Sequence, residues 1–314
     1  MGAKMSLDIV GMGEPMLELN QVKGEDGYKP GFGGDTSNAI VAAARSGAKT
    51  GYFTSLGNDT FGRGFLDLWR TEGVDASAVK IDEDAHTGVY FVTHGPEGHE
   101  FSYLRAGSAA SRIRPQDVPT DYIRAAKIVH VSGISQAISA SAADAVFVAI
   151  EAARAAGVLV SYDTNLRLKL WSLTRARAII HEAMRACDIA LPGLDDAEHL
   201  TGLTDPDAIA DFYLHLGAKV VALTLGKQGS LIATPDTRLR VPSISVQAVD
   251  ATGAGDTFDG AFLAEYLNTR DPMRAGRYAN AAAALSTTGY GAVAPMPMRE
   301  TVLKALAEAE SAAP

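Results

Sequence analysis

The stretch SAADAVFVAIEAARAAGVLVSYD, residues 141–163, contains the pattern that determines the fold class. Its first part, Ser141–Ala156, is alanine-rich and has the length and composition of a helix packed on a core. The run Val158–Asp163 is short and almost continuously apolar, which is typical of a strand buried on both faces of a sheet. A helix that leads directly into such a strand predicts a βαβ arrangement with parallel strands.

The same alternation extends over most of the chain. Further strands are predicted at Leu7–Val10, Thr50–Ser55, Ile128–Val131, Ile189–Leu191 and Val220–Leu225, and further helices at Thr36–Ser46, Phe61–Thr71, Thr174–Ala186 and Pro206–Leu216. No repeat, linker or low-complexity segment divides the chain, so a single domain over residues 1–314 is expected. The predicted architecture is an α/β three-layer sandwich, in which helices cover both faces of a mainly parallel sheet.

Residues 87–105 depart from this alternation. Two runs rich in aromatic and β-branched residues flank Gly95-Pro96-Glu97-Gly98, which is a hairpin signal. A tight turn there places Tyr90 opposite Tyr103, and the twofold period of a strand puts Arg105 on the same face. Such a hairpin could cover a ligand site, or it could be an exposed edge hairpin whose tyrosines cover the core.

Composition and charge exclude several classes of protein. The chain has 314 residues, 47% of them hydrophobic, and a net charge of −9. An acidic surface argues against a nucleic-acid partner. The apolar runs are far too short to cross a bilayer, and the N-terminus lacks the pattern of a secretory signal. The single cysteine, Cys187, cannot form an intrachain disulfide and is interpreted as a small buried residue. A cytoplasmic protein with no membrane partner is therefore expected.

Two widespread nucleotide-binding motifs are not satisfied. Gly11-Met12-Gly13 lacks the third glycine of the dinucleotide fingerprint, and Gly226-Lys227 lacks the upstream glycine of a P-loop. The histidines show no ligand spacing and no Cys/His cluster exists, so no zinc site is expected. The sequence thus supports neither a Rossmann dehydrogenase nor a Walker-type ATPase.

The most informative motif is Asp250-Ala251-Thr252-Gly253-Ala254-Gly255-Asp256. Its small residues allow a tight turn and the close approach of a ligand, and the apolar spacing that follows begins a helix. The free N–H groups of a helix N-terminus suit negative charge that moves between phosphoryl oxygens. Asp256, in the first turn, is placed to take a proton from a substrate hydroxyl, although it could instead only cap the helix.

A second glycine-rich motif, Gly31-Phe32-Gly33-Gly34, also precedes a predicted helix. Its glycines would let a ligand lie against backbone amides, and Asn38 offers both a donor and an acceptor to a polyol. Alone, this motif could equally be a flexible loop before a helix.

Together these motifs resemble those of the ribokinase-like carbohydrate kinases. The segment 250–256, Gly33-Gly34 with Asn38, and Leu56-Gly57-Asn58-Asp59 with Gly62 follow the family's order over essentially the whole chain. The resemblance implies a kinase that uses ATP and Mg²⁺, with Asp256 as general base and the amides of Gly253, Ala254 and Gly255 as the anion hole. It also implies a small β-sheet lid, formed by about 14–34 and 87–105, through which such proteins often form homo-oligomers.

Segments 101–111 and 163–171 are similar to the subgroup of this family whose substrate is the sugar acid 2-keto-3-deoxygluconate. Guanidinium groups match a carboxylate, and Arg105 and Arg167 could clamp it from two sides. Because a buried guanidinium without its anion is costly, a neutral sugar is expected to be rejected. The gluconate and galactonate epimers are not distinguished. By the resemblance, the sugar acid is contacted by Gly33, Gly34, Asn38, Tyr90, Tyr103, Arg105 and Arg167.

The segment Thr224–Ser230 follows a predicted strand and resembles the nucleotide loop of the family. An alanine-rich segment, 280–283, is expected to line the adenine pocket, although Ala281 and Ala283 could equally belong to a helix packed on the sheet. The ATP contacts implied by the resemblance are Asn165, Thr224, Gly226, Lys227, Gly229, Asn280 and Ala283.

The metal positions depart from the family pattern. Gly193-Leu194-Asp195-Asp196 stands where many relatives have Asn-x-x-Glu, and Asp196 is expected to hold Mg²⁺ through water. Asp250 and Thr252 resemble positions that bind a monovalent cation such as K⁺ in some relatives.

Two other functions compete with a sugar-acid kinase. One is a kinase for a neutral sugar such as fructose or ribose, against which Arg105 and Arg167 argue. The other is a non-catalytic sugar-acid-binding relative, against which the intact Asp256 argues, because a binding protein has no use for a base beside an anion hole.

Overall fold

The large sheet of the computed structural model, which describes residues 7–22, 27–95 and 98–312, has eight strands. Its order is β14-β13-β12-β11-β10-β9-β1-β4. The bounds are β1 (Leu7–Met12), β4 (Thr50–Phe53), β9 (Ala126–Ser132), β10 (Leu159–Asp163), β11 (Ile189–Leu191), β12 (Val220–Thr224), β13 (Ser230–Ala233) and β14 (Arg238–Val241). The strands from β12 to β4 are parallel, and β13 and β14 form an antiparallel edge. The predicted mainly parallel sheet is confirmed.

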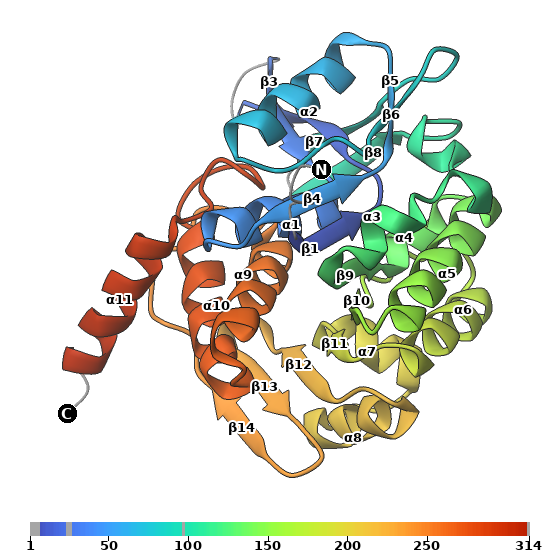
Figure 1. Ribbon diagram of the computed structural model, residues 1–314. Coiled ribbons are helices and arrows are strands. Elements are labelled where there is room, and N and C mark those ends of the chain that lie inside the picture. The colour runs from blue at the N-terminus through green and yellow to red at the C-terminus, as the bar shows by residue number, and fades with distance from the viewer. Residues whose placement is uncertain (1–6, 23–26, 96–97, 313–314) are drawn as a thin grey trace, which may run out of the picture.

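Helices cover both faces of this sheet (Figure 1). They are α1 (Asp35–Arg45), α2 (Thr60–Thr71), α3 (Thr120–Arg124), α4 (Gly133–Ala137), α5 (Ala140–Ala155), α6 (Leu173–Arg185), α7 (Leu194–Thr201), α8 (Pro206–Leu216), α9 (Ala254–Thr269), α10 (Pro272–Ser286) and α11 (Arg299–Ala312). The helices and strands predicted above are present, with bounds that differ by at most two residues. No helix in the described part of the chain is both long and apolar enough to span a membrane.

The stretch around α5 shows why the chain folds in this way. The Ser139 hydroxyl accepts a hydrogen bond from the N–H of Ala142 at 3.0 Å and caps the start of the helix. Gly157, with a φ of 72°, ends it and turns the chain into β10. A capped helix and a glycine turn therefore deliver the apolar run into the sheet.

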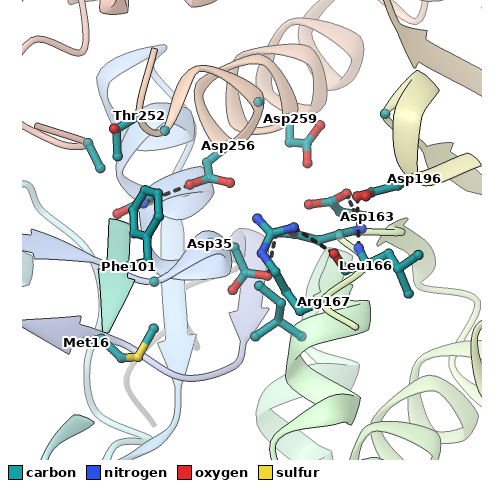
Figure 2. Close-up of a pocket in the computed structure, with 18 of the residues that line it drawn as sticks. Met16, Asp35, Phe101, Asp163, Leu166, Arg167, Asp196, Thr252, Asp256 and Asp259 are labelled. Atoms are coloured by element: carbon teal, nitrogen blue, oxygen red, sulfur yellow. Dashed lines mark hydrogen bonds between the residues drawn. The ribbon is translucent and has the colours of Figure 1, made fainter. Parts of the chain in front are cut away.

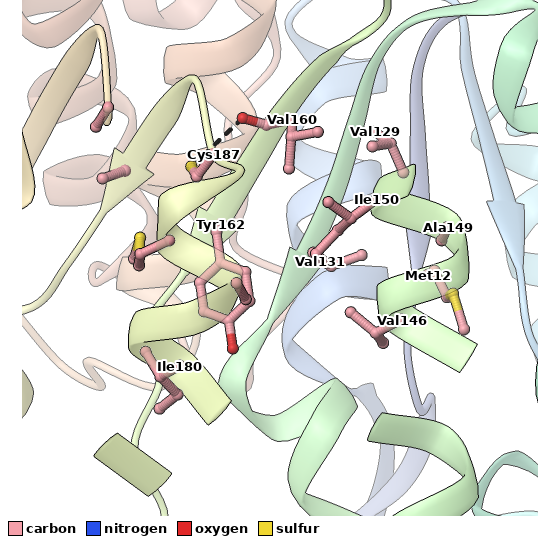
Figure 3. Close-up of a cluster of buried hydrophobic side chains, with 14 of the residues drawn as sticks. Met12, Val129, Val131, Val146, Ala149, Ile150, Val160, Tyr162, Ile180 and Cys187 are labelled. Atoms are coloured by element: carbon pink, nitrogen blue, oxygen red, sulfur yellow. Dashed lines mark hydrogen bonds between the residues drawn. The ribbon is translucent and has the colours of Figure 1, made fainter. Parts of the chain in front are cut away.

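Alternate side chains of the strands enter two separate core layers, which explains the continuous apolar runs. Ile9 and Ile128 pack with α1, α9 and α10, whereas their neighbours Val10 and Val129 pack with α5 and α6. Figure 3 shows the second of these layers, around Val129. Cys187 lies in the second of these layers, and burial raises the pKa of its thiol far above the usual range. The three-layer sandwich is confirmed, and Cys187 is a buried packing residue.

A separate four-stranded sheet contains the predicted hairpin. Its order is β3-β2-β7-β8, with bounds β2 (Met16–Gln21), β3 (Tyr28–Gly33), β7 (Gly88–Gly95) and β8 (Gly98–Leu104). Tyr90 pairs with Tyr103, as the hairpin register predicts, and their ring centroids are 6.1 Å apart. Residues 96 and 97 of the predicted turn, and 23–26 of the predicted lid, fall outside the described residues. A short pair, β5 (Ser55–Gly57) and β6 (Lys80–Asp82), forms a third sheet.

Candidate active site

A cavity of about 670 Å³ lies between the carboxyl ends of β10 and β12, the N-terminus of α9 and the four-stranded sheet (Figure 2). Ligands of open α/β sheets bind at this end of the strands. The cavity brings together motifs that are more than 200 positions apart in the sequence. Of the predicted site residues, those that line it are Gly34, Asn38, Tyr90, Tyr103, Arg105, Asn165, Arg167, Asp196, Thr224, Thr252, Gly253, Gly255 and Asp256.

Asp256 is held in this cavity by the other glycine-rich motif. The side-chain amide of Asn38 donates to Asp256 Oδ2 at 2.8 Å. Burial, and then the nearby Asp35 carboxylate, raise the pKa of Asp256 to about 7, against the opposing effects of Asn38 and Arg167. A carboxyl that titrates near neutral pH can both accept and release a proton under working conditions. Asp256 therefore has the position and the pKa of a general base.

The backbone at the start of α9 is suited to an anion, with one change from the prediction. Gly253 has a φ of 74°, and a Cβ added to Gly255 would point into open space, with no atom of another element within 4 Å. Both glycines line the cavity. The N–H of Ala254, however, donates to the carbonyl of Ala251 at 3.2 Å, and Ala254 is not among the lining residues. The predicted anion hole is thus open at Gly253 and Gly255, and Ala254 supports the turn.

Asp250 fixes the loop that leads to Gly253. Its Oδ1 accepts from the N–H and the hydroxyl of Thr252 at 3.0 and 2.7 Å, and its Oδ2 accepts from the N–H of Gly291 at 2.9 Å. Asp250 does not itself line the cavity. A cation contact at Asp250 and Thr252 stays a prediction.

Three acidic residues of the cavity were missed by sequence reasoning. They are Asp35, Asp163 and Asp259, and Figure 2 shows them around the space that Asp256 faces. Each had a signal in the sequence: Asp35 directly follows Gly34, Asp163 ends a predicted strand, and Asp259 is one helical turn after Asp256.

Among these acids, Asp35 is the clearest candidate to contact a bound substrate. Its Oδ2 accepts from the hydroxyl of Ser132 at 2.5 Å and from the amide of Asn165 at 3.0 Å. Its Oδ1 is buried and has no hydrogen-bond partner in the described structure. A buried carboxylate oxygen without a donor is costly, so this atom is suited to accept a ligand hydroxyl.

Asp163 and Asp259 interact with each other. Burial, followed by the charges of neighbouring carboxylates, raises the pKa of both groups well above the usual range. Burial and the neighbouring negative charges favour the protonated form of each carboxyl. The pair therefore carries less negative charge than its composition suggests.

The two predicted arginines both line the cavity but differ in environment. Arg167 is exposed, donates to the carbonyl of Leu166 at 2.9 Å, and has no ion-pair partner among the described residues. The side chain of Arg105 is only 10% exposed and already forms an ion pair with the buried Glu14. The expectation that a neutral sugar would leave a buried guanidinium without a partner is therefore wrong.

Gly33 and Gly34 make room for neighbouring parts of the chain. The hydroxyl of Tyr90 donates to the buried carboxylate of Glu18, and a Cβ on Gly33 would lie 2.5 Å from that hydroxyl. Gly33 does not line the cavity; it makes room for Tyr90. Gly34, with a φ of 104°, precedes α1 and lets the chain turn against Pro15.

Asp196 lies at the predicted metal position. Its Oδ2 accepts from the N–H of Leu166 at 2.9 Å, and burial raises its pKa. Gly193 also lines the cavity but has no side chain to contribute. Among the described residues, no group of three or more His, Cys, Asp or Glu side chains is arranged to hold a metal ion.

The predicted nucleotide residues divide into two sets. Thr224 and Asn165 line the cavity. Gly226, Lys227 and Gly229 lie on the turn that joins β12 to β13 and do not line it.

The alanine-rich helix α10 is engaged with the sheet. The buried amide of Asn280 donates to the hydroxyl of Ser230 at 3.0 Å and to the carbonyl of Val241 at 2.9 Å. Ala281 is fully buried in the core, and Ala283 is partly buried against it. Asn280 therefore ties α10 to the sheet, and Ala281 packs in the core. An ATP contact of α10 stays a prediction.

Comparisons with known proteins show the family of the chain. A family model described as pfkB family carbohydrate kinase matches residues 5–299. The chain is 36% identical to a 2-dehydro-3-deoxygluconokinase of Thermoproteus tenax, over 97% of this chain and 96% of the relative. It is 34% identical to a probable fructokinase-3 of Arabidopsis thaliana, over 92% and 88%. A crystal structure of a putative ribokinase II from E. coli, in complex with ATP and Mg²⁺, is 26% identical and superimposes with a TM-score of 0.89 over 96% and 99% of the two chains. The chain belongs to the pfkB family of carbohydrate kinases.

Proposed function

We propose that this sugar kinase transfers the γ-phosphoryl group of ATP to the terminal hydroxyl of 2-keto-3-deoxygluconate or its galactonate epimer. The observation that carries the proposal is that Arg167, a guanidinium without a carboxylate partner among the described residues, lines the same cavity as Asp256. A sugar acid would bring the missing anion.

Asp256 is the proposed general base. Asn38 holds one of its carboxylate oxygens, which leaves the other to take the proton of the attacking hydroxyl. As the hydroxyl oxygen forms its bond to the γ-phosphorus, the bond between that phosphorus and the β–γ bridging oxygen breaks, and ADP leaves. The raised pKa of Asp256 makes it a stronger base than an ordinary aspartate.

The N-terminus of α9 is the proposed anion hole. When bound, ATP supplies the phosphoryl group and Mg²⁺ neutralises part of the phosphate charge. The open space at Gly255 and the helix N-terminus fit a phosphate in chemistry and in room. Asp196 would hold Mg²⁺ through water, which agrees with the preference of this ion for one or two carboxylates plus phosphate and water. Asp250 and Thr252 are the proposed neighbours of a K⁺ ion.

The sugar is proposed to lie with its acid group away from Asp256. Transfer requires the terminal hydroxyl to be close to the N-terminus of α9, so the carboxylate of a six-carbon chain points toward Arg105 and Arg167. Asp35 Oδ1, which is buried without a donor, would accept a hydroxyl in between. Tyr90 and Tyr103 would cover the sugar from the four-stranded sheet.

The four-stranded sheet is proposed as the lid of this site and as a contact between subunits of a homo-oligomer. Leu104, at the end of β8, is 60% exposed. A partner subunit would cover it.

A neutral-sugar kinase is the second candidate, and one observation favours it. Glu14 neutralises Arg105, so the cavity holds less free positive charge than two arginines suggest. The similar identity to a fructokinase is compatible with this alternative.

The test is ATP-dependent ADP release over a panel of 2-keto-3-deoxygluconate, 2-keto-3-deoxygalactonate, fructose and ribose. We expect turnover with a keto-deoxy acid. Turnover with fructose alone would support the second candidate. Thermal stabilisation by the sugar acid without turnover would indicate a non-catalytic binding protein and would contradict the proposal.

A further inference from the structure

Arg105 is held by a carboxylate that the sequence motifs did not single out. Glu14 follows β1, and it is 1% exposed. Its Oε2 accepts from Arg105 Nε at 2.9 Å and also from Arg105 Nη2, and its Oε1 accepts from the hydroxyl of Ser108. Both carboxylate oxygens are thus used, and one of them binds two N–H groups of the guanidinium.

This pairing determines which part of Arg105 can reach a ligand. A guanidinium has five N–H groups, and Glu14 takes one on Nε and one on Nη2. The remaining N–H groups are two on Nη1 and one on Nη2. The Nη1–Nη2 edge, which can bind a carboxylate or two oxygens of a sugar, is therefore the edge left for the cavity that Arg105 lines.

The surroundings of Glu14 leave little freedom for this arrangement to change. An added Cβ on Gly34 would collide with the Glu14 backbone carbonyl, and one on Gly88 would lie 3.0 Å from Oε1. The guanidinium of Arg105 also lies 5.7 Å from the ring centroid of Tyr103. Arg105 is therefore held by Glu14 and Tyr103 before any ligand binds, which reduces the ordering cost of binding.

The charges of the two arginines also differ as a result. Glu14 cancels the charge of Arg105, whereas Arg167 has no ion-pair partner among the described residues. Arg105 then supplies hydrogen bonds of fixed direction, and Arg167 supplies net positive charge.

We infer that Glu14 is a positioning residue, which presents the Nη1–Nη2 edge of Arg105 to the sugar substrate. The inference rests on the proposed function only in that Arg105 contacts the sugar; it holds for an acidic or a neutral sugar. It predicts that Glu14 acts on the KM of the sugar through Arg105 and not on the chemical step at Asp256.

The test uses the variants Glu14→Met, Glu14→Gln, Arg105→Met and Glu14→Met/Arg105→Met, with kcat and KM measured for the sugar that the wild type phosphorylates best. We expect Glu14→Met to raise the sugar KM at least about tenfold with kcat changed less than about threefold, because Arg105 loses its anchor. Glu14→Gln keeps one acceptor oxygen for Nε and Nη2 of Arg105, and its amide N–H groups can donate to the Ser108 hydroxyl, so the KM should stay within about threefold of the wild-type value. The double variant should have the KM of Arg105→Met.

An unchanged KM in Glu14→Met, or a double variant whose KM exceeds that of Arg105→Met by more than about threefold, would overturn the inference. Glu14→Met could fail to fold because Arg105 loses its counter-ion. The double variant removes both charges, so comparing its sugar KM with that of Arg105→Met still tests the inference.

Glu72→Met is the matched control. Glu72 binds Arg45 through Nε and Nη2 at 2.9 and 2.7 Å, with side chains 11% and 12% exposed, and neither residue lines the active-site cavity. We expect this variant to lose stability without a change in KM. A tenfold rise in KM here would show that general destabilisation produces the effect, and would overturn the inference. A wild type that prefers fructose would refute the proposed substrate, whereas the Glu14 and Arg105 cycle would still be measured on fructose.

Discussion

The two ends of the active-site cavity are built in different ways. The proposed phosphoryl-transfer end comes from one continuous segment, 250–259, which supplies the turn, the helix N-terminus and Asp256. The proposed sugar end comes from side chains far apart in the sequence, such as Tyr90, Arg105 and Arg167. Tyr90 and Arg105 are each held by a carboxylate from another element. In this proposal the residues of the chemical step are close together in the sequence, whereas those that select the substrate are brought together by tertiary contacts.

This difference explains the mixed identities of the relatives. A segment that carries the chemistry can stay the same while dispersed side chains change the sugar that is bound. Identity near one third to both a 2-dehydro-3-deoxygluconokinase and a fructokinase is what such a division produces. Changes at the two ends should accordingly have different kinetic signatures.

Asp256→Asn should have the largest effect. Asparagine keeps the size of the side chain and can still accept from Asn38, but it cannot take a proton, so kcat should fall by about 10²–10⁴-fold with the sugar KM little changed. The loss should be the same for every sugar, because the base acts on a hydroxyl that they share.

Stability provides a control for this variant. The pKa of Asp256 is raised in the folded protein, so its ionised form costs stability once the pH exceeds the unfolded value near 4. The Tm of Asp256→Asn at pH 8 should therefore equal or exceed that of the wild type. Near-normal kcat in a folded variant would show that Asp256 is only a cap.

Gly255→Val should be next in size. An added side chain at this position meets open space, so the variant should fold while the valine fills the phosphate site. We expect turnover to fall at least about 100-fold, with a smaller loss in Gly255→Ala. Circular dichroism and Tm check the fold, and full activity in both variants would refute the anion hole at this end of the cavity.

The pH dependence of kcat/KM should also identify Asp256 as the base. Because only the ionised carboxyl accepts a proton, kcat/KM at saturating MgATP should fall about tenfold per pH unit below about 7 and level off above it. Measurement from pH 5.5 to 9 at constant ionic strength checks this. A profile without an inflection between pH 6 and 8, or one that Asp256→Asn shares, would contradict the assignment.

The features that could be predicted from the sequence are likewise those formed by residues close together in the chain. The parallel strands, the helices, the hairpin register and the role expected of segment 250–256 could be read from apolar runs and glycine motifs, since these patterns are local. The placement of Asp35, whose Oδ2 binds Ser132 and Asn165 and whose Oδ1 has no partner, could not be predicted in this way. Nor could the pairing of Glu14 with Arg105, because all these contacts join residues about 90 or more positions apart. For the same reason the sequence predicts an Arg105 that needs the anion of the substrate, whereas in the structure Glu14 already neutralises it.

Asn280→Ala should have the smallest effect on catalysis. Its amide joins α10 to β13 and β14, so its removal leaves two buried acceptors unpaired and should cost about 1–3 kcal/mol of stability. We expect a lower Tm with the KM for ATP changed less than about threefold. A large rise in that KM at unchanged Tm would instead support a direct ATP contact.

The most direct test of the central claim is the ratio of kcat/KM for 2-keto-3-deoxygluconate to that for fructose, in the wild type and in Arg167→Met. We expect the wild type to prefer the sugar acid. Because Arg167 is exposed and its charge is screened, the variant should lose roughly tenfold, about 1.4 kcal/mol, on the acid and little on fructose. A wild type that prefers fructose, or an equal loss on both sugars, would contradict the assignment of Arg167 to a substrate carboxylate.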